Sequence, residues 1–173
     1  QRLGAVHFQW HADRIEISVC GRGGHGAHPH LTVDPILAAA HIITAAQSIV
    51  ARNVGPLDSA VLSLCAIHAG NLNAFSVLPR EVKLAGTVRT FKAEVQEVME
   101  QRLTELVEST ARAFGAEGRT IYERIYPATI NHPAQARFAA DVAAKLVGER
   151  NVVLDLAPSM GAEDFAFMLQ EKP

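Results

Sequence analysis

The sequence contains only two cysteines, Cys20 and Cys65, among 173 residues. That number is too small for a disulfide framework or for a paired-cysteine metal motif. Both cysteines lie in strand-like segments, where a cysteine is commonly a small buried residue. Because unpaired cysteines are typical of a reducing compartment, we expect a cytoplasmic protein.

The chain also has little excess charge, with a formal net charge of -2 at pH 7. This balance gives no reason to expect nucleic acid or a membrane as a partner. No apolar run approaches the ~20 residues that span a bilayer. The G-x-S-x-G turn of serine hydrolases and the G-x-x-x-x-G-K phosphate loop are absent as well. Hydrophobic residues at 49% and charged residues at 20% instead indicate a folded, globular protein.

Hydrophobic periodicity predicts alternating strands and helices over most of the chain. Strand patterns occur at 13–21, 60–68, 81–91 and 119–126, and helical patterns occur at 35–52 and 92–114. The run at 60–68 is apolar throughout, which suggests a strand buried on both faces. The resulting β-α-β-β-α-β order predicts an α+β, ferredoxin-like fold, in which two helices cover one face of a four-stranded antiparallel sheet.

The pattern changes after residue 127. Pro133 begins another helical run, and the pair Glu163–Asp164 precedes a last apolar run. The pair could hold a ligand, but acidic residues at a first helical turn are also what the helix dipole favours, and we prefer that explanation. Because this tail has no partner element for its own core, we expect residues 128–173 to be an incomplete part of a second, α/β domain.

Three histidines lie in one glycine-rich turn, at positions 25, 28 and 30. Imidazole can be a metal ligand, but this spacing lacks the regularity of a helical H-x-x-x-H motif. We therefore favour loop hydrogen bonds for His28 and His30. His25 has glycine on both sides and can project from an exposed turn, which suits donation to a developing oxyanion.

Polar residues at two other places are candidates for substrate binding. Arg89 ends the alternating strand on its polar face, where a guanidinium can bind a carboxylate through two hydrogen bonds. A solvated arginine at a strand end is an equal alternative. The loop at 70–76 offers the amide of Asn73 and the hydroxyl of Ser76, either for a substrate or within a long turn.

Three motifs in order resemble the metal-dependent amidohydrolases of the aminoacylase, hippurate hydrolase and indole-acetyl-amino-acid hydrolase type. They are the glycine-histidine turn at 21–30 with Val33-Asp34-Pro35, the segment Gly86-Thr87-Val88-Arg89-Thr90-Phe91, and the segment at 159–165. The resemblance spans roughly 13–171. It implies a ferredoxin-like lid that forms a homodimer, inserted into a catalytic domain with two divalent metal ions, zinc or manganese.

The resemblance also implies roles for individual residues. His25 reaches into the partner subunit's active site and stabilises the oxyanion, and Arg89 holds the substrate carboxylate. Met160 and Gly161 line the substrate pocket from the catalytic domain. Where the family has an Asn-Val-Ile-Pro segment, this chain has Ser76, which offers one donor, so that Asn73 is a candidate to replace the missing amide.

The family's metal ligands and catalytic base are not found between Gln1 and Pro173. We therefore assign no metal ligand and expect a lid at 13–127 plus a catalytic strip at 128–173. By itself this chain should bind no catalytic metal and show no activity. The intact protein should be an amidohydrolase that cleaves N-acyl amino acids, with a metal-bound hydroxide as nucleophile. The alternatives are a dipeptidase of the same superfamily and a free-standing, dimeric ligand-binding or regulatory module.

Overall fold

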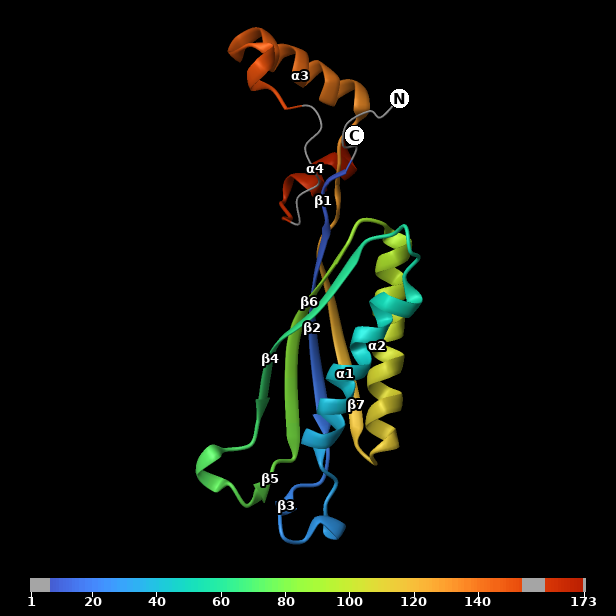
Figure 1. Ribbon diagram of the computed structural model, residues 1–173, viewed down its shortest axis with the longest axis vertical. Coiled ribbons are helices and arrows are strands. Elements are labelled where there is room, and N and C mark those ends of the chain that lie inside the picture. The colour runs from blue at the N-terminus through green and yellow to red at the C-terminus, as the bar shows by residue number, and fades with distance from the viewer. Residues whose placement is uncertain (1–6, 154–160, 173) are drawn as a thin grey trace.

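The computed structural model describes residues 7–153 and 161–172 of the chain. Its main body is a four-stranded antiparallel sheet in the order β4-β6-β2-β7, with two helices on one face (Figure 1). We call this body the lid. Its elements are β2 (His11–Cys20), α1 (Pro35–Asn53), β4 (Ala60–Ala69), β6 (Glu81–Thr90), α2 (Ala93–Ala113) and β7 (Glu117–Tyr126). This order of elements and strands confirms the predicted ferredoxin-like fold.

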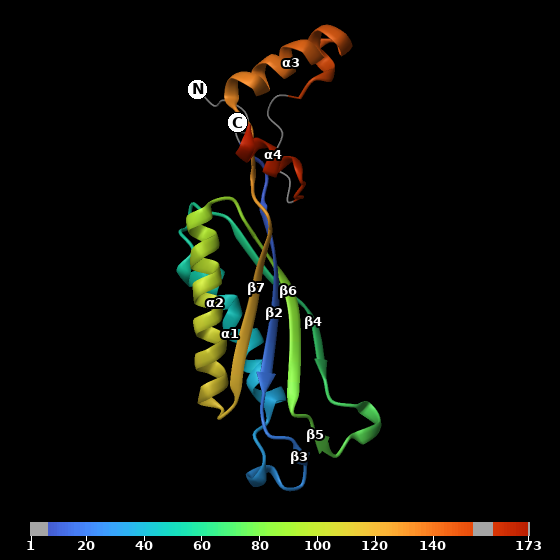
Figure 2. The ribbon, with the colours of Figure 1, turned by 180° about the vertical axis from the view of Figure 1, so that it is seen from behind.

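Smaller elements lie beyond both ends of the sheet (Figures 1 and 2). At the lower end of Figure 1, β3 (Gly24–His25) pairs with β5 (Val77–Leu78). At the upper end, β1 (His7–Gln9) pairs with β8 (Thr129–Ile130). The remaining helices are the 3-10 turns η1 (Pro29–Leu31), η2 (Leu72–Ala74) and η3 (Glu149–Asn151), and the α-helices α3 (Pro133–Val147) and α4 (Phe165–Glu171).

The core lies between the sheet and its two helices. Every second residue of β2 and β6 points toward the helices, which buries Ile15, Ile17, Val19, Val82, Leu84 and Val88. Each helix contributes one apolar stripe at three- and four-residue spacing; the buried members are Ala38, Ala39, Ile42, Ala46 and Ile49 of α1 and Val95, Met99, Leu103, Val107 and Ala111 of α2. Each large aliphatic side chain buried there stabilises the fold by about 1.5–3 kcal/mol.

Capping residues set the boundaries of α1 and α2. The Asp34 carboxylate accepts hydrogen bonds from the backbone N–H groups of Ile36 at 2.8 Å and Leu37 at 3.2 Å, and Pro35 opens α1. Gly115 follows α2 with a φ of 74°, the left-handed conformation that glycine adopts at a helix end. By length and composition α1 could cross a membrane, yet Ala38, Ile42 and Ala46 are fully buried in the lid, as in the core helix of a globular protein.

The prediction that residues 60–68 form a strand buried on both faces is wrong. The strand exists as β4, but it is an edge strand, and Leu62 is its only buried residue. A bulge at Cys65 shifts the pairing with β6, and the residues that follow are exposed. Cys65 is exposed and Cys20 half-buried, so the expected burial of both cysteines is also wrong. A run of apolar residues cannot by itself distinguish a central strand from an edge strand that another surface covers.

The tail beyond the lid leaves apolar side chains uncovered. Helix α3 has no buried residue, and Phe138 and Leu146 are 67% and 79% exposed. Glu163 and Asp164 lie immediately before α4, at the helix N-terminus that their acidic character favours. The division of the chain at residues 127 and 128 stays a prediction.

The close approach of β4 to β6 next to the bulge predicts that Gly86 cannot be replaced without loss of stability. A Cβ on Gly86 would lie 2.1 Å from the carbonyl oxygen of Ser63 and 3.0 Å from the Cα of Leu64, so any larger residue must push the strands apart. We expect Gly86→Ala to lower the free energy of unfolding by about 1–3 kcal/mol, measured by chemical denaturation. The control is Gly55→Ala, whose Cβ would meet a side-chain carboxylate, that of Asp58 at 3.0 Å, and no backbone atom. Equal stability of the two variants would contradict the expectation.

Candidate functional site

The predicted catalytic residue, His25, lies at the end of the lid farthest from α3 and α4 (Figures 1 and 2). It pairs with Val77 across the β3–β5 ladder, and the next residue, Gly26, donates a hydrogen bond to the carbonyl of Ser76 at 2.7 Å. A Cβ on Gly23 would lie 2.7 Å from the carbonyl oxygen of Leu78, so this close packing requires glycine. The glycine-rich sequence therefore places His25 on a well-anchored turn.

The imidazole of His25 is exposed, and a hydrogen bond sets which of its nitrogens carries the proton. The backbone N–H of Ala27 donates to Nδ1 of His25 at 3.1 Å. A neutral imidazole has one acceptor and one donor nitrogen, so Nε2 must carry the proton. The side chain thus presents an N–H donor to whatever approaches the turn.

The other two histidines of the turn contribute to its structure. His28 donates its backbone N–H to the carbonyl of His25 at 2.9 Å and accepts from Leu31 at 3.0 Å. The His28 ring stands edge-on to that of His25, with 5.6 Å between ring centroids, and His30 follows at 6.2 Å from His28. Within residues 7–153 and 161–172, no group of three or more histidine, cysteine or acidic side chains is arranged to hold a metal ion.

The loop that carries Ser76 and Asn73 lies beside the same turn. Ser76 is half-buried and contacts the turn through its carbonyl, whereas Asn73 is exposed on η2 and donates its backbone N–H to the side chain of Asn71 at 2.9 Å. The structure thus places the loop beside His25. Whether either side chain binds a substrate stays a prediction.

Arg89 lies near the opposite end of the sheet. Its guanidinium donates to the hydroxyl of Thr87 and, at 3.0 Å, to the carbonyl of Val88. Thr87 in turn donates to the backbone carbonyl of Asp13 at 2.9 Å. These bonds hold Arg89 on the face of the sheet away from the helices, in a groove of about 380 Å³ that also includes Gly161.

Gly161 is brought to this groove by the start of the lid. Its carbonyl accepts a hydrogen bond from the backbone N–H of Trp10 at 3.3 Å. The structure therefore unites two predicted substrate-binding residues, Arg89 and Gly161, from different parts of the chain. The third, Met160, lies outside the described residues.

A buried polar cluster beneath this groove is absent from the sequence-based predictions. The carboxylate of Asp13 accepts hydrogen bonds from the Gln96 amide at 2.8 and 2.9 Å and from the Tyr122 hydroxyl at 2.6 Å. Burial, and then the bond to Asp13, raise the pKa of the Tyr122 phenol. The cluster ties β2, α2 and β7 together. The sequence pattern could have indicated that Asp13 is buried, because it falls on the same face of the alternating strand as Ile15 and Ile17.

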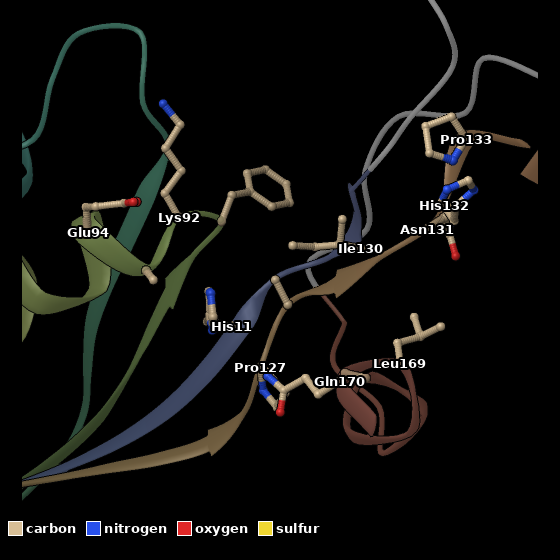
Figure 3. A pocket seen from close by; sticks show the side chains of 14 residues that line it. His11, Lys92, Glu94, Pro127, Ile130, Asn131, His132, Pro133, Leu169 and Gln170 are labelled. Atoms are coloured by element: carbon tan, nitrogen blue, oxygen red, sulfur yellow. The ribbon is translucent and has the colours of Figure 1, made fainter. Parts of the chain in front are cut away.

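A larger cavity, of about 670 Å³, lies where the lid meets the tail (Figure 3). Lys92 and Glu94 line it from the lid side and His132 and Leu169 from the tail side. The Lys92 ammonium lies 2.6 Å from the carboxylate of Asp58, and this hydrogen bond raises the pKa of Lys92. None of the predicted site residues within the described part of the chain lines this cavity, so its size does not identify it as the site.

His25 and Arg89 cannot contact the same small molecule within one chain. Strand β6 runs from Glu81 to Thr90, so Glu81 and Arg89 are roughly 26 Å apart at ~3.3 Å per residue. His25 lies beyond the Glu81 end, because Glu81 pairs with Cys20 and β3 follows Cys20. A site that uses both residues therefore needs two copies of the chain.

Comparison with known proteins gives a consistent match. The family model described as the peptidase dimerisation domain matches residues 12–114. Hippurate hydrolase of Campylobacter jejuni is 37% identical over 93% of this chain and 42% of its own length. N-acetyl-L-cysteine deacetylase of Bacillus subtilis is 37% identical over 93% of this chain and 38% of its own length.

A solved structure matches as well. The YxeP protein of Bacillus subtilis, described as a dinuclear metal-binding peptidase of the M20 family, superposes with a TM-score of 0.73 and 26% identity. The match covers 100% of this chain and 41% of that one. The chain thus spans about two fifths of the length of the relatives it matches.

The hydrogen bond to Nδ1 predicts the tautomer of His25. We expect ¹⁵N NMR above pH 8 to show a protonated Nε2 and an unprotonated Nδ1, because Ala27 donates to Nδ1. Replacing Ala27 with proline removes that N–H and should restore a mixture of tautomers. The exposed His68 on β4 is the control for ordinary tautomer behaviour. A protonated Nδ1 in the unmodified chain would contradict the assignment.

Proposed function

Since the chain belongs to the peptidase dimerisation domain family, we propose that it is the lid and dimerisation segment of a metal-dependent amidohydrolase acting on N-acyl amino acids. The hydrolase class follows from the relatives, and the substrate class is suggested by a hippurate hydrolase and an N-acetyl-L-cysteine deacetylase among them. The observation that carries the proposal is the separation of His25 from Arg89 along one rigid sheet.

The edge strand β4 is the surface that we propose for self-association. Its ten residues carry no charged side chain, and its outward residues, including Ile67 at 58% exposure, are uncovered. The other edge strand, β7, carries Glu117, Arg119, Glu123 and Arg124. Charges protect an edge strand from pairing with another chain, and β4 lacks this protection. The neighbouring helix α1 supports the choice, because Arg52 is its one charged residue.

Antiparallel pairing of two β4 strands about a two-fold axis would complete the site. Val61 of β4 pairs with Arg89, and Ala69 lies at the end where β3 and β5 begin. Because the axis reverses one copy relative to the other, the Arg89 end of each lid would lie beside the His25 end of the other. Each dimer would then have two equivalent sites.

Within such a site the two residues perform different tasks. The Arg89 guanidinium binds the carboxylate of the N-acyl amino acid and positions the amide. The Nε2–H of His25 from the other subunit donates to the carbonyl oxygen as it gains negative charge. Ser76 and Asn73, on the loop beside His25, are further candidates for contacts with the substrate.

The described residues do not form a site for the family's metal ions, so we derive no step from them. The proposal places two divalent ions, zinc or manganese, in the part of the relatives' length that this chain does not span. The uncovered apolar residues of α3, Phe138 and Leu146, support the presence of further structure around the tail. Cytoplasmic location also stays part of the proposal, supported by the absence of a disulfide between Cys20 and Cys65.

The proposed interface predicts the oligomeric state of the chain. We expect a dimer in solution, and we expect Ile67→Glu to raise its dissociation constant about 30-fold or more, because a charge on an uncovered edge opposes pairing. Sedimentation velocity over a concentration series measures this. Ile121→Glu is the matched control, since Ile121 is 64% exposed on the other edge strand. Dissociation by the control variant, or none by Ile67→Glu, would refute β4 as the interface.

A further prediction tests the roles of His25 and Arg89 in the full-length protein, with hippurate as substrate. His25→Ala should lower kcat about 10²-fold, the usual loss for an oxyanion donor, whereas Arg89→Ala should mainly raise KM. His28→Ala is the matched control and should change kcat by less than about threefold, because its contacts serve the turn.

Mixing the two variants distinguishes action across the dimer from action within one chain. Half of randomly reassorted dimers contain one subunit of each variant, and one of their two sites has both residues intact. At substrate concentrations far below the KM of Arg89→Ala, where neither homodimer has appreciable activity, an equimolar mixture of reassorted His25→Ala and Arg89→Ala subunits should therefore recover about a quarter of the wild-type activity. If mixed dimers form but no activity is recovered, action across the interface is excluded.

A further inference from the structure

Two of the most exposed large apolar side chains of the lid lie on the loop beside His25. Leu72 is 98% exposed and Phe75 94% exposed. Leu31 on the neighbouring turn and Val77 on β5 are 60% and 55% exposed. Single exposed apolar residues are ordinary, but a group of large ones around a candidate catalytic side chain indicates a binding surface.

The loop is joined to the His25 turn by backbone hydrogen bonds, so the two form one unit. Val77 pairs with His25, and the Gly26 N–H donates to Ser76 at 2.7 Å. Within the loop, Asn71 accepts from Asn73 at 2.9 Å through its side chain and from Ala74 at 2.9 Å through its carbonyl. Any movement that delivers His25 to a substrate must deliver Leu72 and Phe75 with it.

The loop lies within reach of a ligand that His25 contacts. Paired residues of an antiparallel ladder are ~5 Å apart, and two residues of chain add at most ~7 Å. Phe75, two residues before Val77, is therefore about 12 Å or less from His25 by its backbone. A phenylalanine side chain extends several ångströms further, so it can contact a group attached to the carbonyl that His25 stabilises.

We propose that Leu72 and Phe75 bind the apolar acyl group of the N-acyl amino acid held by the second subunit. This inference rests on the proposed function. The oxygen that His25 contacts belongs to the acyl carbonyl, so the acyl substituent is one bond from the reacting carbon, while the carboxylate is held at Arg89. Strand β4 runs directly into the loop, so the loop continues from the edge of the sheet that carries the proposed interface. The lid would thus select the acyl group as well as stabilise the oxyanion.

The test compares two substrates that share glycine and differ in the acyl group, N-benzoylglycine and N-acetylglycine. In the full-length protein, the double variant Leu72→Ala, Phe75→Ala should lose about tenfold or more of kcat/KM for the benzoyl substrate, because an apolar pocket discriminates by contact area. For the acetyl substrate the loss should stay below about threefold. Phe75→Leu should retain most of the benzoyl activity, since it keeps an apolar side chain of similar reach.

The matched control is Ile121→Ala, an exposed apolar residue on β7 away from the loop, which should leave both substrates unaffected. Equal losses for both substrates, or no loss for either, would overturn the inference while leaving the proposed function intact. Dissociation of the loop variant into monomers by sedimentation would also overturn it, since the loop would then be a subunit contact. A wild-type enzyme that hydrolyses neither substrate would reject the proposed function, and this inference with it.

Discussion

The pairing of β2 with β6 and β7 holds the two ends of the lid at a constant separation. Ten-residue strands, hydrogen-bonded on both sides and packed against two helices, cannot shorten or fold to bring their ends together. His25 is anchored at one end and Arg89 at the other. The buried cluster of Asp13, Gln96 and Tyr122 adds to this rigidity at the Arg89 end, because it ties a helix to two strands through a carboxylate that water does not reach. A stiff lid can carry a catalytic side chain over a distance without losing its orientation.

The fixed separation of the two ends also offers an explanation for the uncharged edge of the sheet. An edge strand without charges is a liability in a monomer, and natural proteins commonly protect such edges. Here β7 is protected by charges and β4 is not. A surface that would be a hazard in an isolated chain is what a two-fold dimer requires. In the proposed dimer, the oxyanion donor, the carboxylate anchor and the apolar loop would be parts of a composite site that neither chain forms alone.

Local sequence patterns were sufficient to predict most of the helices and strands. The helix predicted at 35–52 is found at Pro35–Asn53, because an aspartate cap, a proline at the first position and one apolar stripe all favour it. The alternation of β6 was likewise read correctly, since one of its faces is buried. The failure at β4 has a physical cause: an apolar run reports that a strand will be covered, but not whether the cover belongs to the same chain. The exposure of Cys65 has the same origin in the edge and its bulge.

The sequence by itself determined the order of elements, the family and the identity of the candidate residues, because these depend on neighbouring residues and on motifs. Only the tertiary structure decided where those residues lie relative to one another. It placed His25 beside the loop of Ser76 and Phe75, placed Arg89 beside Gly161, and put the two groups at opposite ends of the sheet. Distances of this kind depend on strand order and register, which arise from contacts between segments far apart in the chain.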